Sequence, residues 1–75
     1  MHHSDIVIHI DEELDDDSIH CLERELSMRD GVLSACVHED RRHLMVVDYD
    51  PDGVRSSDIL SQVRAAGVHA ELIGL

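Results

Sequence analysis

Potential metal-ligating side chains are densest between residues 11 and 21. Six carboxylates fall between Asp11 and Asp17, and His20 and Cys21 follow shortly afterwards. Carboxylate oxygens bind hard divalent cations, whereas a neutral imidazole suits Zn²⁺, Ni²⁺ or Co²⁺. In a helix, Asp17 and His20 would lie side by side on one face, because they are three residues apart. The segment therefore indicates either a divalent transition-metal site or, more simply, an acidic and solvated helix start.

Other histidines are spread along the chain. His38 and His43 flank the polar connection over residues 39–42, and we expect them to face each other across two strands. Such a pair would either hold a metal or serve as a polar contact. His2 and His3 would reach the acidic segment only if the N-terminus folded over it. The start Met1-His2-His3 is assigned no role.

Hydrophobic periodicity predicts the elements that position these groups. Isoleucines at every second position predict a strand over residues 4–10. Apolar residues at helical spacing, closed by Gly31, then predict a helix over residues 16–29. Two alternating segments, 32–38 and 43–49, follow as strands. The apolar residues of these four elements that we expect in the core are Ile6, Ile8, Ile10, Ile19, Leu22, Leu26, Ala35, Val37, Met45, Val47 and Tyr49.

The last third of the chain repeats the helix and strand. Residues 50–53, Asp-Pro-Asp-Gly, form a turn sequence, and Ser56 is expected to cap a second helix that Gly67 ends. Alternation over residues 68–72 predicts a fourth strand. The order βαββαβ is that of the split βαβ motif. We therefore expect one α+β domain over residues 1–75, a ferredoxin-like two-layer sandwich with a four-stranded antiparallel sheet and both helices on one face.

The opposite face of this sheet carries apolar side chains where a water-facing sheet usually carries polar ones. Alternation places four of them there: Val7, Cys36, Leu44 and Val46. These residues are the candidate interface for a protein partner or a second copy of the chain.

Net charge and composition exclude several classes of function. The formal net charge is −11, which opposes binding to nucleic acid or to an anionic membrane and favours cations and basic protein surfaces. The chain has no long apolar run, so we expect a cytoplasmic location, with the two cysteines reduced and unpaired. It also has no nucleophile elbow, phosphate loop or HExxH motif, and we expect no enzymatic activity.

From the first helix onward the sequence resembles the heavy-metal-associated domain of copper chaperones and metal-pumping ATPases. The residues that carry the resemblance are Leu22-Glu23, Leu26, Gly31-Val32, Tyr49-Asp50-Pro51 and Gly67-Val68-His69-Ala70. The family binds Cu(I) or a similar ion through a Cys-x-x-Cys at the start of the first helix. Counted back from Gly31-Val32, those two positions fall on Asp15 and Ser18, and neither is a thiol.

These observations lead to one principal prediction and two alternatives. The principal prediction is a small non-enzymatic binding or interaction module of this fold that lacks the thiolate pair and acts in metal homeostasis, with no certain cofactor. The first alternative is a harder divalent metal, Zn²⁺, Ni²⁺ or Co²⁺, at a site made from five residues: Asp15, Asp17, Ser18, His20 and Cys21. The second is a regulatory or ligand-sensing domain that dimerises through its sheet.

Overall fold

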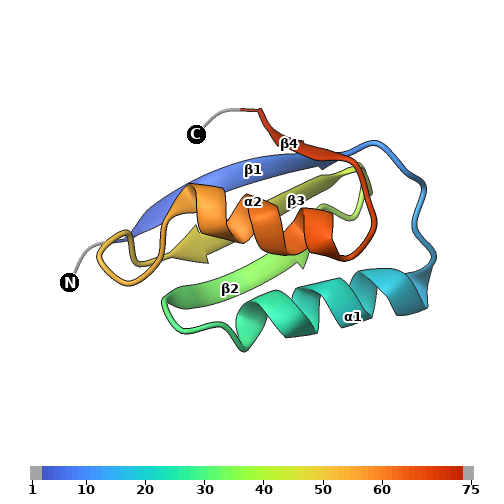
Figure 1. Cartoon of the computed structure of the whole chain (residues 1–75). Helices are drawn as coiled ribbons and strands as arrows, with labels where there is room; N and C mark the ends of the chain where they lie inside the picture. Colours follow the sequence, from blue (N-terminus) through green and yellow to red (C-terminus); the bar gives the residue numbers. More distant parts are fainter. Residues whose placement is uncertain (1–2, 74–75) are drawn as a thin grey trace.

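Four strands and two helices alternate along the chain in the predicted order in the computed structural model, which describes residues 3–73 (Figure 1). The elements are β1 (Ser4–Ile10), α1 (Asp16–Ser27), β2 (Val32–Val37), β3 (Leu44–Tyr49), α2 (Ser56–Ala65) and β4 (Ala70–Leu72). Neither helix has the length and apolar character of a membrane span within these residues.

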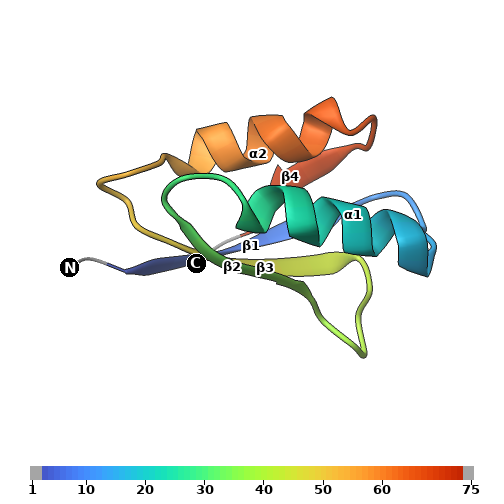
Figure 2. The ribbon, with the colours of Figure 1, turned by 90° about the horizontal axis from the view of Figure 1, so that it is seen from below.

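The strands form one antiparallel sheet in the order β2-β3-β1-β4, so β1 and β3 are its central strands. Both helices lie on the same side of this sheet (Figure 2). The other side is uncovered, and we call it the open face. The predicted ferredoxin-like two-layer sandwich is therefore confirmed.

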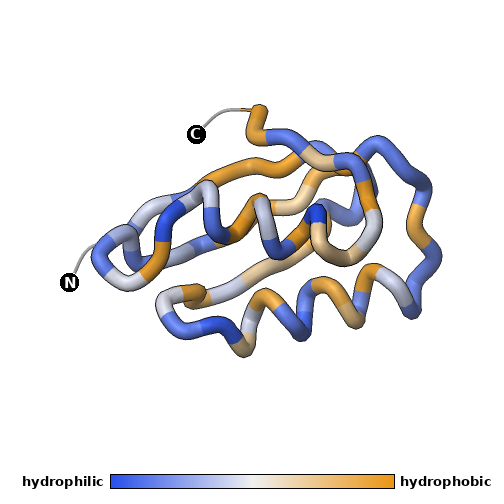
Figure 3. Tube along the Cα trace, in the orientation of Figure 1, coloured by the Kyte–Doolittle hydropathy of each residue, from blue (hydrophilic) through white to orange (hydrophobic). Residues whose placement is uncertain are grey.

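The core lies between the sheet and the helices, and aliphatic side chains dominate it. Every second residue of β1 and β3 is buried beneath the helices, and the helices contribute Leu26, Ile59 and Val63 at 0% exposure. Tyr49 is the only aromatic residue and is also buried. Figure 3 shows hydrophobic residues gathered on the strands and recurring along each helix, while the loop after β1 is mostly hydrophilic. Burying this apolar surface is the main driving force for the fold.

Several predicted element ends need correction. Helix α1 stops at Ser27 rather than at residue 29, because the backbone N–H of Arg29 donates to the carbonyl of Leu26, three residues back, instead of continuing the helical pattern. Ser56 is not a cap but the first residue of α2. The N-cap is Arg55, whose backbone N–H donates to Asp58 Oδ2 at 3.3 Å. The last strand begins at Ala70, two residues later than expected.

Gly31 lies in the turn that follows α1, where another turn packs closely against its backbone. Its φ is +92°, and its carbonyl accepts the N–H of Asp50 at 2.7 Å. A Cβ at this position would lie 2.9 Å from Val54 Cγ1 and 3.0 Å from the backbone of Gly53. Glycine is therefore required both by the backbone angle and by the turn that packs against it.

A charged contact joins two loops at the far end of the sheet. The side chain of Glu12, after β1, accepts the backbone N–H of His69 at 2.7 Å, and its second oxygen lies 2.6 Å from His69 Nδ1. The hydrogen bond to Glu12 raises the pKa of His69, and the same contact lowers the pKa of Glu12. His69 therefore gives its backbone N–H to Glu12, and β4 starts at the next residue, Ala70.

We expect Gly31→Ala to destabilise the protein much more than Gly67→Ala, its matched control. Gly67 has a similar φ of +93° but no atom within 4 Å of an added Cβ. The control should therefore lose only about 1 kcal/mol from backbone strain, whereas Gly31→Ala should lose about 2–4 kcal/mol because of the added clash. Urea denaturation measures both values. Equal losses would mean that the turn at residues 50–54 moves away freely.

We expect Glu12→Gln to lower the pKa of His69 toward its ordinary value of 6.5. In the wild type, the contribution of His69 to stability is complete below pH 6.5 and is lost as pH rises through its raised pKa. The contribution of Glu12 is complete above pH 4.5 and is lost as pH falls through its lowered pKa. An NMR titration of the imidazole gives the test, with Glu13→Gln as control. An unchanged pKa of His69 in Glu12→Gln would contradict the assignment.

Candidate functional site

The positions that the resemblance assigns to a thiolate pair serve here to begin α1. Asp15 is the N-cap of the helix, and its Oδ1 accepts the backbone N–H of Ser18 at 2.8 Å. The hydrogen bonds from Ser18 lower the pKa of Asp15, so its carboxylate is held in the charged form. This is an ordinary helix cap, favoured also by the positive end of the helix dipole.

The other predicted metal ligands of α1 divide between two sides of the helix. Asp17, Ser18 and Cys21 line a shallow hollow of about 550 Å³ that reaches α2. His20 lies elsewhere, with its Nδ1 3.9 Å from Glu23 Oε1 and its side chain 83% exposed. Among residues 3–73, these side chains do not form a group of three donors within reach of one ion. A metal site at these five residues stays a prediction.

The histidine pairing expected across the hairpin is wrong. The ring of His43 stacks on that of His9, with ring centroids 5.9 Å apart. The backbone holds His43 next to β1, since its carbonyl accepts the N–H of Ile10, the last residue of that strand. His38 Nδ1 instead accepts the backbone N–H of Asp40 at 3.2 Å. The stacked pair borders a hollow of about 790 Å³ between the loop after β1 and the β2–β3 connection. Both acidic residues and arginines line it, so it offers no uniform set of ligands.

The predicted interface residues lie together on the open face. Val7 is opposite Val46 in the β1–β3 register, and Cys36 is opposite Val46 in the β2–β3 register. Ile73, which sequence reasoning missed, donates its N–H to the Val7 carbonyl and is 51% exposed. We call Val7, Cys36, Val46 and Ile73 the apolar row. Leu44 lies one step along β3, opposite His9.

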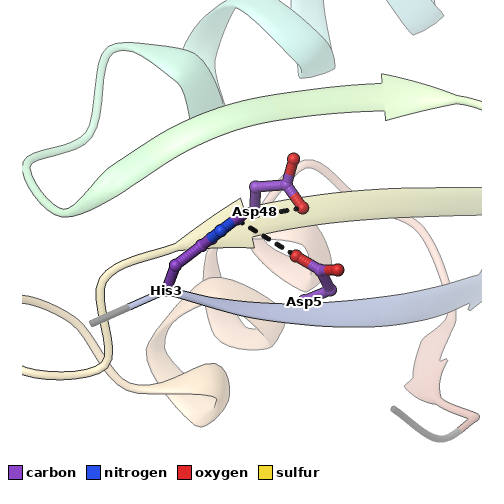
Figure 4. A group of neighbouring side chains, drawn as sticks. All are labelled: His3, Asp5 and Asp48. Carbon is purple, nitrogen blue, oxygen red and sulfur yellow. Dashed lines mark ion pairs between the residues drawn. The ribbon is translucent and has the colours of Figure 1, made fainter. Parts of the chain in front are cut away.

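A second group on the open face was not predicted at all. His3, Asp5 and Asp48 each offer one donor atom, and the three atoms lie within 4.8 Å of one another (Figure 4). His3 Nε2 is 3.2 Å from Asp5 Oδ1 and 3.6 Å from Asp48 Oδ1. The contact between the two carboxyl groups raises the pKa of Asp5 and lowers that of Asp48, to which Ser34 also donates. We call these three residues the His3 cluster.

The His3 cluster was missed because its members are far apart in the sequence and meet only through strand pairing. The one available signal was that Asp5 and Asp48 are both placed on the open face by alternation. Their direct opposition depends on the β1–β3 register, which the sequence pattern does not specify. His3 was considered only as a partner for the loop before α1, and the structure places it beside β3 instead. His2 lies outside the described residues.

Comparison with known proteins identifies the fold. No protein-family model matches the sequence, and no curated protein sequence matches it significantly. Solved structures do match. The N-terminal domain of a potential copper-translocating P-type ATPase from Bacillus subtilis, in the Cu(I)-loaded state, superimposes with a TM-score of 0.86 and is 22% identical, over 97% of this chain and 90% of the other.

Two further structures agree. A copper-binding domain from a P-type ATPase gives a TM-score of 0.83 at 24% identity over 93% of both chains. The copper chaperone of Enterococcus hirae, in its apo form, gives 0.80 at 19% identity over 91% of this chain and 98% of the other. At these identities the likeness concerns the fold: the chain has the fold of the copper-binding, heavy-metal-associated domains.

Proposed function

We propose that this chain is a non-enzymatic binding module that presents the open face of its sheet to a protein partner. The observation that carries the proposal is the apolar row, which crosses β2, β3 and β1 and ends at Ile73, the residue after β4, on a face that no helix covers. Val46 is 36% exposed and Ile73 51%. A sheet face that is exposed to water normally carries polar side chains, so a continuous apolar row is typical of a contact surface.

The charges around the row favour a basic partner over a second copy. The four strands contain no Lys or Arg, whereas Asp5, Asp48 and Glu71 border the row. Two copies, each with a formal charge of −11, would bring acid against acid at this surface. A partner with an apolar centre and a basic rim would instead be attracted and oriented by the same charges.

The loop before α1 supports a role other than Cu(I) transfer. Cu(I) prefers soft sulfur ligands, and the two loop positions hold an aspartate and a serine joined in a helix cap. The two thiols, Cys21 and Cys36, are free and lie on α1 and β2. Because the similar solved structures are copper-binding domains, a supporting role beside such domains in metal homeostasis forms part of the proposal.

We expect Cys36→Lys with Val46→Lys to weaken partner binding at least tenfold while the fold is retained. Both side chains are exposed, so the two lysines should change the stability of the free protein little. In the complex they would be buried in an apolar contact and repelled by the basic rim of the partner, which weakens binding. The partner is captured by immobilised wild type, identified, and measured by calorimetry against both proteins. Met28→Lys, at an exposed apolar residue after α1, is the matched control.

The outcomes of this experiment are distinct. Binding that weakens with salt, is lost in the double variant and survives in Met28→Lys supports the proposal. A captured protein that binds the double variant equally well contradicts it. Sedimentation of the wild type at high concentration tests whether a second copy of the chain binds this face. A dimer that the double variant abolishes would show that the occupant is a second copy and not a basic partner.

We expect wild type to bind Cu(I) weakly and Asp15→Cys with Ser18→Cys to bind it tightly, because the double variant restores two thiolates at the start of α1. Competition with a Cu(I) chelator measures both affinities. Adding Cys21→Ser to the double variant shows whether the neighbouring thiol takes part. A wild-type complex of one Cu(I) per chain that resists the chelator would contradict the prediction. The lost N-cap should cost about 1 kcal/mol of stability.

A further inference from the structure

The His3 cluster has the donor spacing of a site for one metal ion. In a tetrahedral zinc site with ligands at about 2.0–2.1 Å, neighbouring ligand atoms are about 3.3 Å apart. The distances from His3 Nε2 to Asp5 Oδ1 and Asp48 Oδ1, 3.2 and 3.6 Å, are close to that value. Three donors, two on neighbouring strands and one on the residue before β1, therefore lie within 4.8 Å of one another (Figure 4).

The repulsion between the two neighbouring carboxylates would be relieved by a bound cation. Asp5 and Asp48 lie directly opposite each other in the β1–β3 register, and like charges in that position destabilise a sheet. The strands around them contain no Lys or Arg. His3 is the one basic side chain with an ion pair to either carboxylate among the contacts of residues 3–73. A divalent cation would neutralise both carboxylates at once.

The surrounding structure orients the cluster. Ser34 on β2 donates its hydroxyl to Asp48 Oδ2 at 2.9 Å, which leaves Oδ1 directed toward His3. Asp5 and Asp48 are both carried by the central strands of the sheet. A carboxylate oriented by a second hydrogen bond on a paired strand is characteristic of preorganised metal ligands.

We infer that His3, Asp5 and Asp48 form a site for one Zn²⁺ ion, with one imidazole nitrogen, two carboxylate oxygens and water completing the coordination. The mixed nitrogen and oxygen donors suit Zn²⁺ and its analogue Co²⁺, and they lack the sulfur that Cu(I) prefers. Mg²⁺ and Ca²⁺ take oxygen ligands in greater number. Water can complete the site because the three side chains are 55%, 59% and 34% exposed.

This site is separate from the loop before α1 and does not depend on the partner proposed above. Its natural control is the set of donors on α1, since Asp17 and His20 supply the same chemistry in another place. His3→Ala and Asp48→Asn remove donors of the cluster, whereas His20→Ala and Asp17→Asn remove donors of α1. His2→Ala tests the neighbouring imidazole.

The experiment titrates the full chain with Zn²⁺ by calorimetry and with Co²⁺ by visible absorption, which reports the ligands around the ion. We expect one ion per chain, and a loss of affinity of at least tenfold in His3→Ala and Asp48→Asn. His20→Ala, Asp17→Asn and His2→Ala should bind as wild type does. His3 is exposed, so its variant tests the site even if Asp48→Asn proves unstable.

Three results would overturn the inference. If wild type binds neither ion, the cluster is an ion pair only. If His20→Ala or Asp17→Asn loses affinity while His3→Ala does not, the ion lies at α1. If all variants bind equally, the ion is held by none of these residues.

Discussion

The alternation of side chains along the two central strands is the constraint on which the rest of this molecule depends. In β1 and β3, one set of residues is fully buried beneath the helices, so the intervening set must face outward. A slip of one residue in either strand would exchange the two sets and bury His9 or Asp48. Because that exchange is so costly, the face of the sheet on which each of these residues lies is firmly determined. The apolar row and the His3 cluster both exist because of it.

The same constraint explains what could be predicted from the sequence. The burial of Ile6, Ile8 and Ile10 can be predicted from their spacing at every second position. The turns that follow the two helices can be predicted from Gly31 and Gly67, because glycine readily adopts the positive φ found there. The meeting of Asp5 with Asp48, and of His9 with His43, depends on which residues of two separate strands lie opposite each other. No local pattern contains that information. Residues whose role depends on their own segment were therefore predictable, whereas groups assembled across strands were not.

The start of α1 shows how one backbone accommodates different chemistry. A helix N-terminus favours any negative group, whether a thiolate or a carboxylate, and Asp15 satisfies that preference while also accepting the N–H of Ser18. The fold therefore needs no cysteine at this position. A shared fold does not by itself imply a shared activity, and here the side chains of the loop differ from those that bind soft metals.

The edges of the sheet have a consequence of their own. Strand β4, at one edge, has only three residues, and β2, at the other, is interrupted by an irregularity between Val32 and Ser34. Short or bulged edges are poor templates for another strand, so they protect the chain from edge-to-edge aggregation. They also make it a poor acceptor for an extended peptide that binds by strand addition. The partner proposed above would thus be bound through side-chain contacts rather than through backbone pairing.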